Sequence, residues 1–213
     1  MRLCSPLIKP YRDTNWRQQI EAAWSFLNKG YKMRGSPSSH THVNMSLSGP
    51  FKTQDLKRIA QAAIHFKPAL DQLMPGFNVD QNMKSLGLGK KASHGIKAID
   101  AIQDSANPKD LIRLIQEPND ENYDWNFTCI LASEIKEVSF RRPPTSKTSQ
   151  EVLGWVELAM SFGLAAIKCS ETEDLQKISA DVQGLRWFLT QSSVEGVTQA
   201  ERMQGLWRKT GRP

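Results

Sequence analysis

The segment from His40 to Leu47 constrains the fold more than any other part of the chain. Polar and apolar residues alternate along it with a period of two, which is the pattern of a half-buried β-strand. Its polar face would consist of two imidazoles, an amide and a hydroxyl, from His40, His42, Asn44 and Ser46. Such a face can line a polar cleft or simply face solvent, and the spacing alone leaves both interpretations open.

A second polar strand face is expected between Ile135 and Arg142, where Glu137, Ser139 and Arg141 share one side. If both polar faces border one cleft, the imidazoles, carboxylate and guanidinium suit a phosphate-bearing ligand with a divalent metal. The alternative is that Glu137 and Arg141 pair on a solvent-facing sheet, which would contribute less than about 1 kcal/mol. A further strand is expected at 124–131 because apolar residues alternate there with Asn126 and Thr128.

Helices are expected on both sides of these strands. The first, at 15–28, has Trp16, Ile20, Ala23, Trp24 and Leu27 on one face. Thr53 is expected to cap the next helix, which Pro68 must break. Thr148 and Glu151 form a capping box that opens the strongest helix. Further helices are expected at 95–104 and 109–116, with two C-terminal helices opened by Ser170 and Thr198, and 74–93 is expected to be a loop.

This order of strands and helices predicts an α+β fold with mainly antiparallel pairing. We expect one domain over residues 3–168, with helices of residues 169–213 packing on it. Because Gly-rich turns from strand to helix are missing, a doubly wound parallel sheet is disfavoured.

Composition narrows the function classes. The chain has 213 residues, three scattered cysteines and a net charge of +6. Without a CxxC pair, neither a zinc ribbon nor a redox motif is supported. The basic excess is diffuse and lacks interleaved aromatics, so a nucleic-acid partner is disfavoured. No apolar run has bilayer length and no signal-peptide pattern is found, so we expect a cytoplasmic protein without a membrane partner.

Three motifs in this order resemble the fungal amidoligase family, relatives of glutamine synthetase and the carboxylate–amine ligases. The first is Ser5-Pro6, then the Trp16 helix leading into His40-Thr41-His42-Val43. The second is Trp125-Asn126-Phe127. The third is Phe140-Arg141-Arg142-Pro143-Pro144, followed by the helix around Trp155. The match spans roughly residues 3–168.

The resemblance implies a glutamine-synthetase-like fold, with an antiparallel sheet that holds ATP and Mg²⁺ on one face and helices on the other. It implies an amidoligase that activates a small-molecule carboxylate as an acyl phosphate, which an amine or peptide captures as an amide. The site would consist of His40 and Glu137 as metal ligands, Arg141 and Glu137 in catalysis, and His42, Asn44, Ser46 and Arg142 at the nucleotide.

The chain also departs from the family pattern. Ser139 stands where the family has a metal-binding Glu, and the earlier strand with acidic ligands is missing. The resemblance therefore also implies an alternative function: a truncated or catalytically degenerate amidoligase that acts as a binding module. A missing strand would leave a sheet edge open to self-association or to a partner subunit that completes the site.

Overall fold

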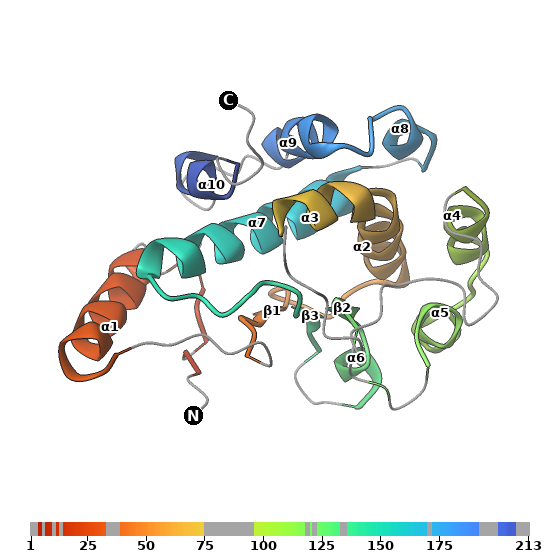
Figure 1. Ribbon diagram of the computed structural model, residues 1–213. Helices are drawn as coiled ribbons and strands as arrows, with labels where there is room; N and C mark the ends of the chain where they lie inside the picture. The colour runs from red at the N-terminus through yellow and green to blue at the C-terminus, as the bar shows by residue number, and fades with distance from the viewer. Residues whose placement is uncertain are drawn as a thin grey trace.

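The computed structural model describes residues 4–5, 7–9, 12, 15–32, 39–74, 96–117, 120, 123–132, 136–169, 172–191 and 200–207. Within these residues the fold is α+β, as the sequence predicts, with a small antiparallel sheet and a larger helical layer (Figure 1). The strands are β1 (Val43–Met45), β2 (Trp125–Asn126) and β3 (Val138–Phe140). The helices are α1 (Trp16–Gly30), α2 (Thr53–His65), α3 (Lys67–Leu73), α4 (Ile96–Gln103), α5 (Pro108–Ile115), α6 (Cys129–Ala132), α7 (Ser149–Lys168), α8 (Thr172–Gln176), α9 (Val182–Thr190) and α10 (Ala200–Trp207).

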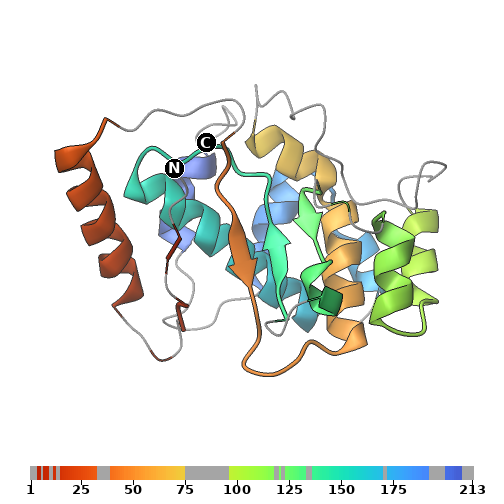
Figure 2. The same ribbon diagram turned by 90° about the horizontal axis from the view of Figure 1, so that it is seen from below.

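The sheet has the order β1-β3-β2, and both pairs are antiparallel. Val43 pairs with Phe140, which pairs in turn with Trp125, so these three apolar residues form one row across the sheet. Trp125 stacks on Phe140 at 4.5 Å and on Phe162 of α7 at 4.8 Å between ring centroids. The apolar sheet face is therefore the one that packs on α7. Figure 2 shows the sheet from its other side, with the helical layer behind it.

Helix α7 is the centre of the helical layer, and α1, α2, α9 and α10 pack against it (Figure 1). It begins where the capping box predicts: Thr148 Oγ1 accepts a hydrogen bond from Glu151 N at 3.2 Å. Glu151 in turn accepts one from Lys147 N at 2.7 Å. Satisfying these end groups fixes the helix start.

Other helix boundaries follow equally local rules. The predicted break at Pro68 is confirmed, since α2 ends at His65 and α3 begins at Lys67 with Pro68 in its first turn. Proline is tolerated there because its missing N–H would have had no partner within the helix. The expected cap at Thr53 is wrong by one residue, because Lys52 is the N-cap and its N–H bonds Asp55 at 2.9 Å.

The strands are shorter than the alternation predicts. The expected strand at 124–131 ends at Asn126, whose Oδ1 accepts hydrogen bonds from Thr128 N at 2.8 Å and Thr128 Oγ1 at 2.7 Å. This side-chain turn redirects the backbone into α6, so the strand assignment beyond Asn126 is wrong. The expected strands at 40–47 and 135–142 have regular ladder pairing only at 43–45 and 138–140.

The C-terminal part contains one helix more than expected. Between α8 and α10 lies α9, which begins at the N-cap Asp181. Its apolar face buries Leu185, Phe188 and Leu189, and Phe188 contacts the rings of Phe66 and Phe162 at 4.8 and 5.8 Å. The helix therefore belongs to the central aromatic cluster. The sequence did not predict it because its apolar periodicity covers only a short segment.

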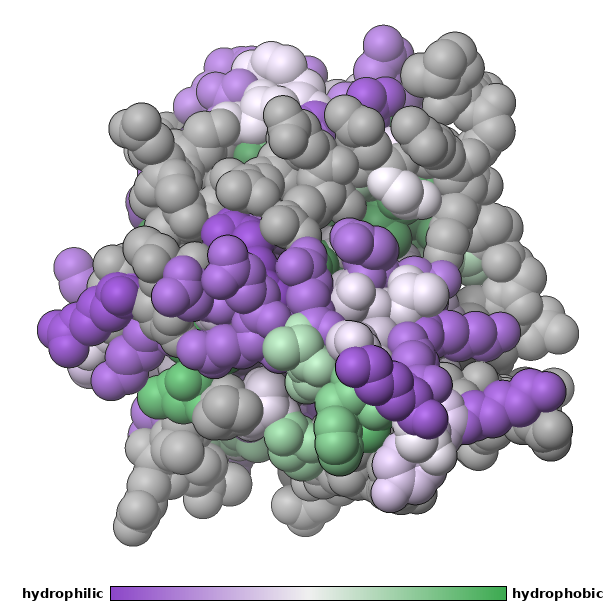
Figure 3. Space-filling model, turned by 90° about the vertical axis from the view of Figure 1, so that its left-hand side faces the viewer, coloured by the Kyte–Doolittle hydropathy of each residue, from purple (hydrophilic) through white to green (hydrophobic). Residues whose placement is uncertain are grey.

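Helix α1 packs less completely than its periodicity predicts. Of the predicted face, Trp16 is buried, Ile20, Trp24 and Leu27 are half-buried, and Ala23 is exposed. Phe26 is 72% exposed, and Figure 3 shows apolar side chains at the surface on the side of the molecule where α1 lies. The N-terminal half of α1 is thus its main attachment to the helical layer. The expected loop at 74–93 falls, after Met74, outside the described residues.

Candidate functional site

The two predicted polar faces meet on the side of the sheet turned away from α7. Asn44 pairs directly with Ser139, which pairs with Asn126, so these side chains form one row. Asn44 Nδ2 donates a hydrogen bond to Glu137 Oε1 at 3.0 Å. Because this bond joins side chains of β1 and of the segment entering β3, the two polar faces lie side by side, one of the two arrangements that the sequence left open.

The two histidines of this surface lie just before β1. Their rings are nearly parallel, with centroids 6.5 Å apart and an interplanar angle of 29°. His40 pairs with Pro144 in an isolated bridge, one residue out of register with the ladder from Val43 to Phe140. The extra residue lies in the 141–143 segment, so the strands are joined through a β-bulge, a feature that redirects side chains.

Thr41 fixes the backbone at this bulge. Its N–H donates to Pro143 O at 2.9 Å, and its hydroxyl donates to Pro144 O at 2.8 Å. The same hydroxyl lies 2.8 Å from Ser146 Oγ and accepts a hydrogen bond from Ser146 N at 3.0 Å. The bonds of Thr41, whose side chain lies on the opposite side of the strand, therefore fix the backbone between His40 and His42.

Arg141 and Ser46 lie at the two ends of the surface. Arg141 directly follows the last ladder pair of β3 and is half-buried, with its backbone N–H bonded to Asp124 O at 2.8 Å. Ser46 directly follows β1 and is exposed. Along the chain, Ser46 is two residues from Asn44, whereas Arg141 is four residues from Glu137.

Arg142 does not join them. Its guanidinium forms an ion pair with Asp71 of α3, and its Nη1 lies 3.7 Å from Asp124 Oδ2. Only 7% of its side chain is exposed. The structure thus places Arg142 toward Asp71 and Asp124, and not beside His42, Asn44 and Ser46, with which it was expected to bind a nucleotide.

The middle of the polar face is closed. Ser139 is completely buried, and its hydroxyl has no hydrogen-bond partner within the described part of the chain. Asn126 is also completely buried, and its carboxamide oxygen serves the turn into α6. A dissolved ligand can therefore contact the rim of the face, at His40, His42, Asn44 and Glu137, but not its centre.

The donor set does not fit Mg²⁺. Magnesium prefers several oxygen ligands, with carboxylates supplying the charge. Among the described residues no three His, Cys, Asp or Glu side chains gather as metal ligands. Glu137 supplies a carboxylate on the polar face, and one of its oxygens already accepts a hydrogen bond from the Asn44 side-chain amide. His40 and Glu137, which were expected to bind the metal, therefore lack further acidic ligands among the described residues.

Two further histidines, His65 and His94, lie outside the motifs of the polar strands. His65 lies on α2, and its Nε2 is 2.9 Å from Ile178 O. Burial lowers the pKa of His65, and the hydrogen bond to Ile178 partly opposes this. His65 thus has a packing role, while His94 lies outside the described residues.

A hollow that the motifs do not indicate lies at the junction of α1 and α7, lined by Lys29, Lys32 and Lys147 among others. The sequence gives little signal for it because its two walls are far apart along the chain.

Comparisons with known proteins add no relative. No protein-family model, curated protein or solved structure matches the chain. Within the ranges described above, no helix is long and apolar enough to cross a membrane. Support for a function has to come from the side chains of the polar face.

Proposed function

We propose that the chain has an amidoligase-type fold and that its polar sheet face binds a small ligand with a carboxylate or phosphate group. The hydrogen bond from Asn44 to Glu137 carries the proposal, because it joins the two polar strand faces into one surface. The ordered motifs around His40, Trp125 and Phe140 support the amidoligase-type fold.

The chemistry of the rim suits an anion. Arg141 presents a guanidinium, whose paired N–H groups match the two oxygens of a carboxylate or phosphate. The imidazoles of His40 and His42 lie on the same surface and can donate further hydrogen bonds. The charged end of a ligand would bind at this rim. The ligand would not contact Ser139, because that residue is completely buried.

We further propose that binding takes place without the metal-dependent ligase step. A divalent cation beside a triphosphate needs anionic ligands. Glu137 is engaged by Asn44, and Ser139 offers a buried hydroxyl in place of a carboxylate. These two features favour the degenerate, binding-module alternative over an active ligase.

An active amidoligase is the second candidate, favoured by the paired imidazoles and the motif order. In that reaction a carboxylate attacks the γ-phosphate of ATP to give an acyl phosphate and ADP. An amine then displaces phosphate to form the amide. The missing carboxylates would have to come from a partner subunit.

Calorimetric titration with ATP, with and without Mg²⁺, separates the candidates. A binding module should take up ATP equally well without Mg²⁺, and Arg141→Gln should weaken binding roughly tenfold. Arg113→Gln, an exposed charge change on α5, is the matched control and should leave the affinity unchanged. Binding that depends on Mg²⁺, with ADP formed from an acid and an amine, would instead support the ligase. No heat from folded protein at millimolar ATP would refute both.

A further inference from the structure

The hollow between α1 and α7 lies apart from the residues of the polar face. Its volume is about 540 Å³, and its wall consists of Asn28, Lys29, Gly30, Tyr31, Lys32 and Lys147. The first five residues form the end of α1 and the segment after it, and Lys147 directly precedes the N-cap of α7. All six lining residues are exposed, so the hollow is open to solvent.

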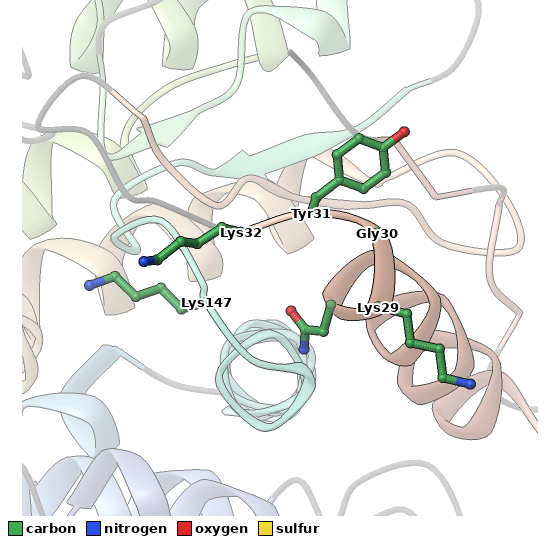
Figure 4. Close-up of a pocket in the computed structure, with 6 residues that line it drawn as sticks. Lys29, Gly30, Tyr31, Lys32 and Lys147 are labelled. Carbon is green, nitrogen blue, oxygen red and sulfur yellow. The ribbon is translucent and has the colours of Figure 1, made fainter.

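The wall of this hollow is basic. Lysines make up half of the lining residues, and no carboxylate is among them. In the view of Figure 4 the side chains of Lys32, after α1, and of Lys147, before α7, extend in the same direction, with both ammonium groups on the same side of the hollow. Two ammonium groups held close together repel, and an anion between them converts that repulsion into attraction.

Two lysines outside the hollow have acidic partners. Lys67 pairs with Asp71 and Lys177 with Asp174, at 2.7 and 2.9 Å. Within the described ranges, no ion pair is found for Lys32 or Lys147. Lys29 has a local explanation, because it lies in the last turn of α1 where a cation complements the helix dipole, and Figure 4 shows it pointing away from the other two. Within the described residues, Lys32 and Lys147 are thus two cations of this hollow that have no acidic partner.

The neighbouring carboxylate of Glu151 is committed to the backbone. Its Oε2 accepts the N–H of Lys147 at 2.7 Å, and its own N–H is capped by Thr148. The two bonds hold the N-terminus of α7 and the residue before its N-cap in place. They also fix the backbone from which the Lys147 side chain extends.

We propose that this hollow binds a small molecule carrying a phosphate or pyrophosphate group, held between Lys32 and Lys147. Lysine binds such groups as a compact point charge with three donors. A phosphate group offers several oxygens, so both ammonium groups can bond it at once. The open hollow leaves room for the remainder of the ligand.

Inorganic pyrophosphate, titrated at low ionic strength by calorimetry, is the probe. We expect saturable binding that the double variant Lys32→Gln, Lys147→Gln weakens at least roughly tenfold, because both charges are removed. The control is Lys109→Gln, Lys168→Gln, which makes the same change in net charge at exposed positions of α5 and at the far end of α7. This control should bind pyrophosphate as the unaltered protein does.

Acetylation of lysines, read by mass spectrometry, gives a second readout that needs no variant. Pyrophosphate should protect Lys32 and Lys147 and leave Lys109 and Lys168 reactive. No saturable binding, an equal loss in both double variants, or uniform protection would each overturn the proposal. Because protection from acetylation is read at Lys32 and Lys147 themselves, failure of this site is visible separately from failure of the polar face.

Discussion

Arg17 and Glu157 form a buried ion pair that fastens α1 to α7. Arg17 Nε donates to Glu157 Oε1 at 2.7 Å, and the Nη2 atom lies equally close to the same oxygen. Their side chains are 7% and 0% exposed, and the Arg17 guanidinium also lies 4.4 Å from the centroid of the Trp16 ring. Because the rest of α1 is only partly covered, this pair is its main polar attachment to the helical layer.

Glu157→Ala should destabilise the protein by about 3–5 kcal/mol, because it leaves a buried guanidinium without its carboxylate. The free energy of unfolding in urea measures the effect. The double variant Arg17→Met, Glu157→Leu should be more stable than Glu157→Ala, since it removes the buried charge altogether. If Glu157→Ala lowered the free energy of unfolding by less than about 1 kcal/mol, which is little more than a typical surface substitution costs, this account would be contradicted.

Gly184→Ala should be strongly unfavourable for a steric reason. A Cβ atom at Gly184 would lie 1.8 Å from Ser179 O, a backbone atom that cannot move away freely. We expect a loss of at least about 1–3 kcal/mol in thermal or urea unfolding. Gly205→Ala on α10 is the matched control because a Cβ there meets nothing within 4 Å. Its higher helix propensity should instead stabilise the protein, by up to about 1 kcal/mol.

The stability of the protein should fall as the pH drops through the titration of His65. Burial lowers the pKa of His65 in the folded state, so the unfolded chain binds this proton more readily. The contribution of neutral His65 to the free energy of unfolding is therefore complete above the pKa of about 6.5 that it has in the unfolded chain. It is lost as the pH falls toward the lower pKa of the folded state. Urea unfolding at several pH values should show a shallower decline below neutral pH in His65→Asn than in the unaltered protein. Identical slopes would contradict the assignment.

The neighbouring arginines 141 and 142 should have separable effects. Arg142→Gln removes the partner of Asp71 and Asp124 and should destabilise the fold by about 1–3 kcal/mol. Arg141→Gln should leave the unfolding free energy nearly unchanged and weaken ATP binding. Calorimetry and urea unfolding of both variants test this division. A loss of ATP binding in folded Arg142→Gln, with none in Arg141→Gln, would reverse the assignment.

Ser139→Ala should be neutral or stabilising, because the buried hydroxyl has no hydrogen-bond partner in the described part of the chain. Ser139→Glu would insert a carboxylate at a fully buried position and should destabilise the protein markedly. Comparing the two unfolding free energies tests whether the centre of the polar face is closed. A stable Ser139→Glu variant that gains Mg²⁺ affinity would show instead that the centre is open to ligands.

Helix boundaries were predictable because they depend on neighbouring residues. The Thr148–Glu151 capping box, the break before Pro68 and the start at Asn107-Pro108 each act within one turn of the chain. Alternation likewise predicted which side chains of β1 and β3 share a face, since successive strand residues point in opposite directions.

Strand ends and the depth of the site depended on distant partners. The turn made by Asn126, the burial of Ser139 and the bulge opposite His40 arise only where separate strands meet. The same holds for the ion pair that turns Arg142 toward Asp71 and for the hollow that Lys32 and Lys147 line. By itself the sequence determined the start of α7, the break at Pro68 and the faces of the strands, because those interactions are local. Only the tertiary structure decided which polar groups are buried, paired or left to meet a ligand, because that depends on contacts between segments far apart in the chain.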